Sequence, residues 1–335
     1  MAAVSAAVVK RRLDRPSRPY DRSANSVGRE YDAWTREGIL EHYWGEHIHL
    51  GYYTDPELAK GYLRKDFIEA KYNFTQRMMT FGGLEEITKS SVAEKPLVSI
   101  LDVGCGIGGT TRYLASALPN AKVLGITLSN EQAERATKLA KERRVPNAEF
   151  RVVDALNMDF PDNSFDVVWG CESGEHMPDK KKYIEEMTRV LKPEGKLVVA
   201  TWCQRHNATR SFTRALDFLY SEWTHPYFIS IEDYKKIMEG TNQLQNIVTQ
   251  DWTKNTIASW RHSIWVGVFD PWPVIKAGPR MWWKVRFLLT FFSFFSQCLR
   301  DGICLERMHR AFKRGLMDYG MFAATKKSLP VAPAA

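Results

Sequence analysis

Side chains able to move protons follow one apolar segment of the chain closely. Glu172, Glu175 and His176 come directly after the apolar stretch 165–169, and His225 lies further along. Carboxylates and imidazoles are the usual general acids and bases of enzymes. We therefore predict that Glu175, His176 and His225 are the candidate proton acceptors of an active site. The alternative for each is a structural histidine or a capping carboxylate.

A glycine-rich turn occurs earlier in the chain. The apolar run 99–103 contains Asp102 and is followed by glycine at positions 104, 106 and 108. Glycine lets the backbone adopt left-handed conformations and approach another group closely. The pattern predicts a strand-to-helix turn that binds a nucleotide-type cofactor. The alternative is a tight turn with no ligand.

The residues that follow the second and third predicted strands distinguish between possible cofactors. A nicotinamide site has the spacing GxGxxG and an acid after the second strand, whereas this chain has GCGIGG and Thr127. The phosphate-binding pattern GxxxxGK[ST] is absent. Asp154 follows the third predicted strand, where a carboxylate can accept a hydrogen bond from an adenine amine. These features favour S-adenosylmethionine.

The net charge of +8 has one main source. Between Lys276 and Lys327 there are 11 Lys and Arg residues against 3 Asp and Glu, among many aromatic residues. Basic and aromatic residues together are typical of segments that lie on membrane surfaces. We expect Phe287–Phe295 to dip into a membrane interface, with the following arginines near head groups: Arg286, Arg300, Arg307 and Arg310. The alternative is a solvated face beside a buried helix. Nucleic acid is a weaker alternative, because no binding motif for it is present.

The five cysteines are scattered without metal-ligand spacing, so no metal is predicted, and a reducing compartment is the default. No stretch reaches the ~18 apolar residues that a membrane-spanning helix needs.

Short apolar strands alternate with helices from residue 98 onward, which predicts a doubly wound, mostly parallel α/β sheet. One continuous helix is expected over 56–84, and a helical insert over 255–315. The expected strands are 98–103, 122–126, 148–153, 165–169, 196–202, 247–252 and 319–325.

The expected organisation has six parts. They are a flexible basic tail or transit-peptide remnant (1–30), an N-terminal helical cap (31–92), a cofactor-binding core (93–205), a substrate lid with membrane-facing helices and the sixth strand (206–318), the last strand (319–327) and a tail (328–335).

Several motifs together carry a resemblance to a known family. The run D-V-G-C-G-I-G-G, the D-A after the third strand and L-K-P-E-G-K before the fifth resemble class I S-adenosylmethionine-dependent methyltransferases. Segments 31–35, 39–51, 125–129, 160–166, 172–180 and 201–203 are similar to the tocopherol methyltransferase group. Within that group, 223–226, the region of Trp265 and 320–326 resemble the cyanobacterial-type methyl-phytyl-benzoquinol methyltransferases.

The resemblance implies a seven-stranded methyltransferase sheet and C-methylation of a prenylated benzoquinol, with a phytyl or solanesyl tail, on the route to tocopherols and plastoquinone. A γ-tocopherol methyltransferase or a small-molecule N-methyltransferase are the alternatives. The location implied is a membrane surface, in the plastid of an alga or plant or on the cytoplasmic face in a bacterium.

Two further sets of residues are expected at the site. The cofactor set is Asp102, Gly104, Cys105, Gly106, Gly108, Thr127, Leu128, Gln132, Asp154, Ala155, Glu172 and Tyr43. The substrate set is His47, His49, Trp202, Trp223 and Trp265. The segment 43–53, dense in aromatic residues and histidines, is expected to cap the cofactor, with core packing as the alternative.

Overall fold

The computed structural model of the chain describes residues 18–85, 98–209, 214, 216–220, 222–273 and 287–328, and only the backbone of residues 287–298. Within this part, no helix is both long enough and apolar enough to cross a membrane.

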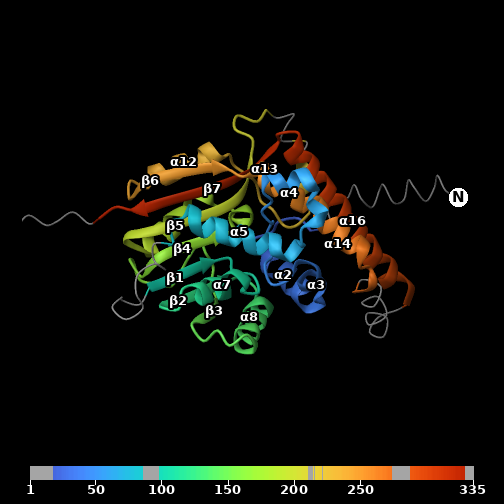
Figure 1. The fold of residues 1–335 in the computed structure, drawn as a ribbon, viewed down its shortest axis with the longest axis horizontal. Helices are drawn as coiled ribbons and strands as arrows, with labels where there is room; N and C mark the ends of the chain where they lie inside the picture. Colours follow the sequence, from blue (N-terminus) through green and yellow to red (C-terminus); the bar gives the residue numbers. More distant parts are fainter. Residues whose placement is uncertain are drawn as a thin grey trace, which may run out of the picture.

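Seven strands form one sheet in the order β3-β2-β1-β4-β5-β7-β6. Strands β1 to β5 pair in parallel, and β7 runs antiparallel to both of its neighbours (Figure 1). The predicted mostly parallel α/β sheet is therefore confirmed. The strands are β1 (Val98–Val103), β2 (Ala121–Thr127), β3 (Ala148–Val152), β4 (Phe165–Cys171), β5 (Leu191–Gln204), β6 (Leu244–Asp251) and β7 (Met317–Lys326).

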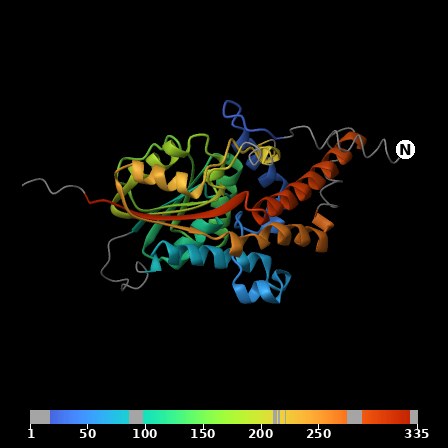
Figure 2. The ribbon, with the colours of Figure 1, turned by 90° about the horizontal axis from the view of Figure 1, so that it is seen from above.

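Helices cover both faces of the sheet (Figures 1 and 2). Successive strand side chains point to opposite faces, so Ile100 joins the core that includes α5 and α7, while Leu101 joins the core that includes α9 and α12. α8 packs beside β3. The helices are α5 (Phe67–Phe81), α7 (Gly109–Ala117), α8 (Asn130–Glu142), α9 (Lys180–Val190) and α12 (Ile231–Gly240).

The N-terminal region differs from the expectation in two ways. The single helix expected over 56–84 is wrong, because Gly61 turns the chain at φ 97° and Asp66 starts a new helix by accepting from the Glu69 N–H at 2.8 Å. The expected tail does not extend to residue 30, because Arg18 forms an ion pair with Glu30 at 2.8 Å. The elements are α2 (Ser26–Glu37), α3 (Ile39–Trp44), α4 (Asp55–Lys60) and η1 (Tyr62–Arg64). Residues 1–17 and the expected boundary at 92 lie outside the described residues.

The expected helical insert is present and projects past one end of the sheet (Figures 1 and 2). α14 and α16 pack against each other there. Arg300 forms an ion pair with Glu222, so the structure does not support its expected place at head groups. Arg286 and the side chains of Phe287–Phe295, which were expected at the membrane interface, lie outside the described residues. The elements are α11 (Asp217–Tyr220), α13 (Thr253–Thr256), α14 (Ala258–Phe269) and α16 (Phe287–Lys313).

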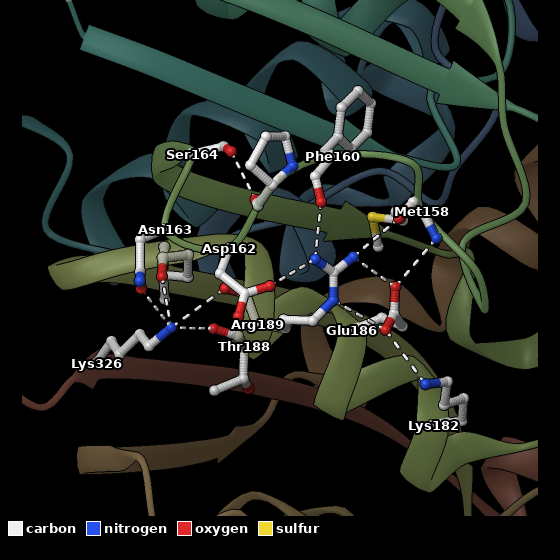
Figure 3. A network of polar contacts seen from close by, with 12 residues as sticks. Met158, Phe160, Asp162, Asn163, Ser164, Lys182, Glu186, Thr188, Arg189 and Lys326 are labelled. Carbon is white, nitrogen blue, oxygen red and sulfur yellow. Dashed lines mark hydrogen bonds and ion pairs between the residues drawn. The ribbon is translucent and has the colours of Figure 1, made fainter.

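A polar network ties the end of β7 to the end of α9 (Figure 3). The Lys326 ammonium donates to the backbone oxygens of Thr188 and Leu191, each at 2.7 Å. The Arg189 guanidinium donates to Glu186 and to the Met158 oxygen, each at 2.9 Å. These contacts satisfy buried carbonyl groups where the helix gives way to β5.

Candidate active site

The glycine turn lies at the carboxyl end of β1. Gly104, Gly106 and Gly108 have φ of 85°, 56° and 80°, a region that L-residues with side chains rarely adopt. A Cβ on Gly104 would lie 2.3 Å from the Cβ of Ser173. The turn therefore needs glycine both for its backbone conformation and for its close approach to the end of β4.

A cavity of about 310 Å³ opens beside this turn. Most of the predicted cofactor residues line it, and the structure brings together Asp102, Gly104, Cys105, Gly106, Thr127, Leu128, Gln132, Asp154, Ala155 and Glu172. Two predicted cofactor residues, Gly108 and Tyr43, do not line the cavity. Gly108 faces the Phe150 ring, which a Cβ at this position would meet. The Tyr43 hydroxyl donates to the Asp270 oxygen at 2.6 Å. We call this space the polar cavity.

Hydrogen bonds hold the polar wall of this cavity in place. The Thr127 hydroxyl donates to Gln132 Oε1 at 2.7 Å. Asp154 Oδ1 accepts from the Leu156 N–H at 2.9 Å. Burial raises the pKa of Asp102 to about 7, although the Thr111 hydroxyl donates to it. The cavity thus presents the Asp154 carboxylate after β3 and the backbone groups of the glycine turn after β1.

The N-terminal segment supplies part of the wall that the sequence did not predict. Tyr20, Asp21, Arg22 and Asn25 line the polar cavity. An Arg22 nitrogen lies 3.9 Å from Asp154. The sequence around these four residues gave no indication of this role. They reach the strand ends because α2 packs against α8.

Residues 46–49 lie over the glycine turn, within the segment 43–53 that we predict to cap the cofactor. A Cβ on Gly109 would lie 2.0 Å from the Glu46 oxygen, and Glu46 accepts from Arg112 at 2.7 Å. His47 and His49 are buried, lie 3.3 Å apart and line the polar cavity. Burial lowers the pKa of His49 to about 4. Both histidines were predicted to contact the substrate, but neither of them lines the larger cavity described next.

A second, mainly apolar cavity of about 1280 Å³ lies under α14 and α16. We call it the apolar cavity. It is larger than the ~300–1,000 Å³ of ordinary small-molecule pockets. Its lining includes the three predicted tryptophans and all three predicted proton acceptors: Trp202, Trp223, Trp265, Glu175, His176 and His225.

Four residues line both cavities: Tyr31, Ile48, Glu172 and His176. They mark the place where a group held in the polar cavity can reach a molecule held in the apolar cavity. The sequence had placed Tyr31 and Ile48 only within motifs of the family and gave them no role.

His176 is the centre of this junction. Its Nε2 lies 3.1 Å from the Tyr31 hydroxyl, and its ring stacks on His225 with centroids 4.7 Å apart. Burial lowers the pKa of His176 to about 4 and lowers that of His225 as well. Both rings are therefore neutral at physiological pH, which is the form that accepts a proton.

Two carboxylates stand beside the histidines, and Glu175 is buried while Glu172 is half-buried. Glu172 Oε1 accepts from the Leu50 N–H at 2.8 Å and from the Tyr319 hydroxyl at 2.6 Å. Glu175 Oε1 accepts from the Trp202 N–H at 2.7 Å. Burial and, for Glu172, repulsion by Glu175 raise the pKa of these groups. Among the described residues, no group of three or more His, Cys, Asp or Glu side chains is placed to hold a metal ion.

The sheet order, the glycine turn after β1 and the acid after β3 define a class I methyltransferase. Residues 101–199 match the family described as Methyltransferase domain. The chain is 40% identical to the 2-methyl-6-phytyl-1,4-hydroquinone methyltransferase of Synechocystis sp. over 91% of this chain and 89% of that protein. It is 32% identical to the chloroplastic tocopherol O-methyltransferase of Arabidopsis thaliana, over 86% and 79%.

The chain belongs to the family of S-adenosylmethionine-dependent methyltransferases that includes these two proteins. It is an S-adenosylmethionine-dependent methyltransferase, as the motifs predicted. Solved structures agree on the fold. The [4+2]-cyclase SpnF matches with a TM-score of 0.68 at 22% identity, covering 93% of this chain and 99% of that one. A geranyl diphosphate methyltransferase matches at 0.62 and 18%, covering 89% and 97%.

Proposed function

We propose that this methyltransferase transfers a methyl group to a ring carbon of a prenylated benzoquinol, with 2-methyl-6-phytyl- or 2-methyl-6-solanesyl-1,4-benzoquinol as the acceptor. The observation that carries the proposal is the junction of the polar cavity with an apolar cavity of about 1280 Å³. The name of the Synechocystis relative supports the same acceptor.

The polar cavity fits S-adenosylmethionine. Gly104 and Gly106 line the cavity without side chains, so their backbone groups are open to a ligand, and Asp154 offers a carboxylate for the adenine amine. When bound, the cofactor supplies an activated methyl group on a sulfonium. The product is then S-adenosylhomocysteine, and the chemistry requires no metal.

His176 is the proposed proton acceptor for the phenol of the acceptor ring. Removing this proton raises the electron density of the ring, and a neutral imidazole in a buried site is suited to take it. Tyr31 holds the imidazole in place through its hydroxyl. His225 and Glu175 are the alternatives, and a second acceptor is also needed for the ring proton. The residues must hold the ring carbon about 3–3.5 Å from the methyl group.

The rim of the apolar cavity suits a prenyl tail that remains partly in a lipid bilayer. Val268, Pro271 and Leu299 lie on its lining. Phe269 and Trp272, which directly follow Val268 and Pro271 in the chain, are 70% and 61% exposed. Exposed aromatic and aliphatic side chains of this kind favour a membrane interface. We therefore propose peripheral binding to a membrane, in the plastid of an alga or plant or on the cytoplasmic face in a bacterium.

Labelled S-adenosylmethionine with a panel of acceptors tests the proposal. The expected result is label on a ring carbon of the phytyl and solanesyl benzoquinols. The same benzoquinol without a prenyl tail is the matched control, and we expect much slower turnover because it leaves the apolar cavity unfilled. Label found only on γ-tocopherol, or only on an amine, would overturn the proposal in favour of an alternative.

A further inference from the structure

Glu172 is held at the junction of the two cavities by three elements. It directly follows β4 and has φ 50°, an unusual value for glutamate. Its N–H donates to the Ala200 oxygen of β5 at 2.8 Å. Leu50 and Tyr319 donate to its Oε1, as described above. These contacts fix the carboxylate in the wall that both cavities share.

The transferred methyl group must stand at this same junction, because it leaves one cavity for the other. Among the four residues that line both cavities, Glu172 is the one whose side chain becomes negative near neutral pH. The sulfonium of S-adenosylmethionine carries a positive charge, and the thioether of S-adenosylhomocysteine carries none. Glu172 is therefore the group at the junction that can respond to that difference in charge.

No cation forms an ion pair with Glu172 among the described residues, although Lys71 is near enough to interact with it electrostatically. Two lysines are near but are occupied otherwise. The Lys71 ammonium donates to the Trp44 oxygen and lies 3.8 Å from the Phe67 ring centre. The Lys180 ammonium donates to the Gly174 oxygen at 2.7 Å. Neither forms an ion pair with Glu172 or Glu175.

Six other titratable groups lie near Glu172, on five elements. They are Glu175 and His176 of η2 (Gly174–His176), Cys171 of β4, Tyr31 of α2, Lys71 of α5 and Tyr319 of β7. The carboxylate of Glu175 and the desolvated surroundings oppose a negative charge on Glu172 when the cavity holds no cation. A cation bound in the polar cavity would instead favour the negative charge on Glu172.

We propose that Glu172 distinguishes S-adenosylmethionine from S-adenosylhomocysteine, by releasing a proton to solvent when the sulfonium binds and taking up a proton when the neutral thioether remains. The site then loses its charge attraction for the cofactor once the methyl group has left, which favours release of the product. This proposal rests on the proposed cofactor site.

Calorimetric binding of S-adenosylmethionine and S-adenosylhomocysteine between pH 6 and 9 tests it. Below the titration of Glu172, affinity for S-adenosylmethionine should rise about tenfold per pH unit, while affinity for S-adenosylhomocysteine stays nearly flat. Titrations in two buffers of different ionisation enthalpy should show proton release with the first ligand only. Equal pH dependence for both ligands, or no proton release, would overturn the proposal.

Two variants localise the effect. Glu172→Gln should lower the preference for S-adenosylmethionine roughly 10- to 100-fold and abolish its pH dependence. The matched control Glu175→Gln should keep the pH dependence and shift it to lower pH, because a repelling carboxylate is lost. A Glu172→Gln protein that keeps the dependence contradicts the proposal.

If Glu172→Gln does not fold by circular dichroism, Tyr319→Phe serves in its place. Loss of the hydroxyl donor to Glu172 should move the pH dependence to higher pH, and an unmoved dependence would contradict the proposal. These binding assays need no acceptor. Failure of the prenylated benzoquinol to be methylated would therefore count against the proposed function alone.

Discussion

The Tyr31 hydroxyl and His176 Nε2 lie 3.1 Å apart, at the junction of the polar and apolar cavities. The other ring nitrogen, Nδ1, lies 3.4 Å from the Thr224 oxygen. Because a carbonyl oxygen can only accept, this contact favours the proton on Nδ1 and leaves Nε2 as the acceptor. The tyrosine hydroxyl thus donates to Nε2. A bound phenol would give its proton to this nitrogen either by displacing the hydroxyl or by passing the proton through it.

Replacing His176 with alanine should lower kcat by about 10²- to 10⁴-fold, the usual contribution of a positioned base. Tyr31→Phe should lower it less, because the imidazole remains. Since the pKa of His176 is about 4, its titration should not limit kcat above about pH 5. Steady-state kinetics with a binding assay for the cofactor measure both effects. Near-normal turnover in both His176→Ala and His225→Ala would contradict the proposed proton acceptors.

Asp154→Ala should weaken S-adenosylmethionine binding by roughly 10- to 100-fold, as expected for loss of a hydrogen bond to an ionised group. The measurement is the dissociation constant. Asp159→Ala is the matched control, since Asp159 is an exposed acid near the same strand end, paired with Arg151 at 2.6 Å, and it lies outside the cavity lining. Equal affinity of the two variants would count against an adenine contact by Asp154.

Gly104→Ala should destabilise the fold by at least about 1–3 kcal/mol, because a side chain at φ 85° is strained and its Cβ would meet Ser173 at 2.3 Å. Gly302→Ala is the control. It lies in α16, where a Cβ would meet no atom within 4 Å, so the change should be neutral or stabilising by about 0.5–1 kcal/mol. Urea denaturation compares the two, and similar midpoints would show that the turn tolerates a side chain.

Glu186 should make stability depend on pH. Burial alone raises its pKa, but Arg189, the Met158 N–H and Lys182 outweigh burial and hold the pKa at about 2. A carboxylate whose pKa is lower in the folded state contributes stability above its unfolded value, ~4.3, and loses it as the pH falls toward 2. Glu186→Gln should cost about 2 kcal/mol at pH 7 and little near pH 2. A constant difference in unfolding free energy across this range would rule the effect out.

Membrane binding should depend on the rim of the apolar cavity. The double variant Phe269→Asp with Trp272→Asp should reduce binding to anionic liposomes at least tenfold, because it places charges where apolar side chains would enter the interface. Val248→Asp on β6 is the control, since it changes an exposed valine of 48% exposure away from the cavity. Sedimentation with liposomes at low and high salt gives the readout. Equal losses in both proteins would mean that the rim has no special role.

The sequence alone was sufficient for the class of fold and for most of the polar cavity. Apolar runs, alternating glycines and an acid after the third strand are local patterns, and in a parallel sheet the carboxyl ends of the strands meet at one edge. Asp102, Gly104 and Asp154 could therefore be placed together without coordinates. Local residues also encode the break between α4 and α5, since Gly61 turns the chain and Asp66 caps the next helix. The apolar spacing across the break nevertheless suggested one continuous helix.

Only the tertiary structure decided which distant residues share the junction. Tyr31 meets His176 across 145 positions, and Tyr319 meets Glu172 across 147. The tertiary structure also placed His47 and His49 beside the glycine turn and brought the N-terminal segment onto the polar cavity. No local pattern encodes such contacts, because they depend on how α2 and β7 pack on the sheet. The motifs thus determined what chemistry the chain carries, and packing determined which side chains meet at the junction where we propose that the methyl group is transferred.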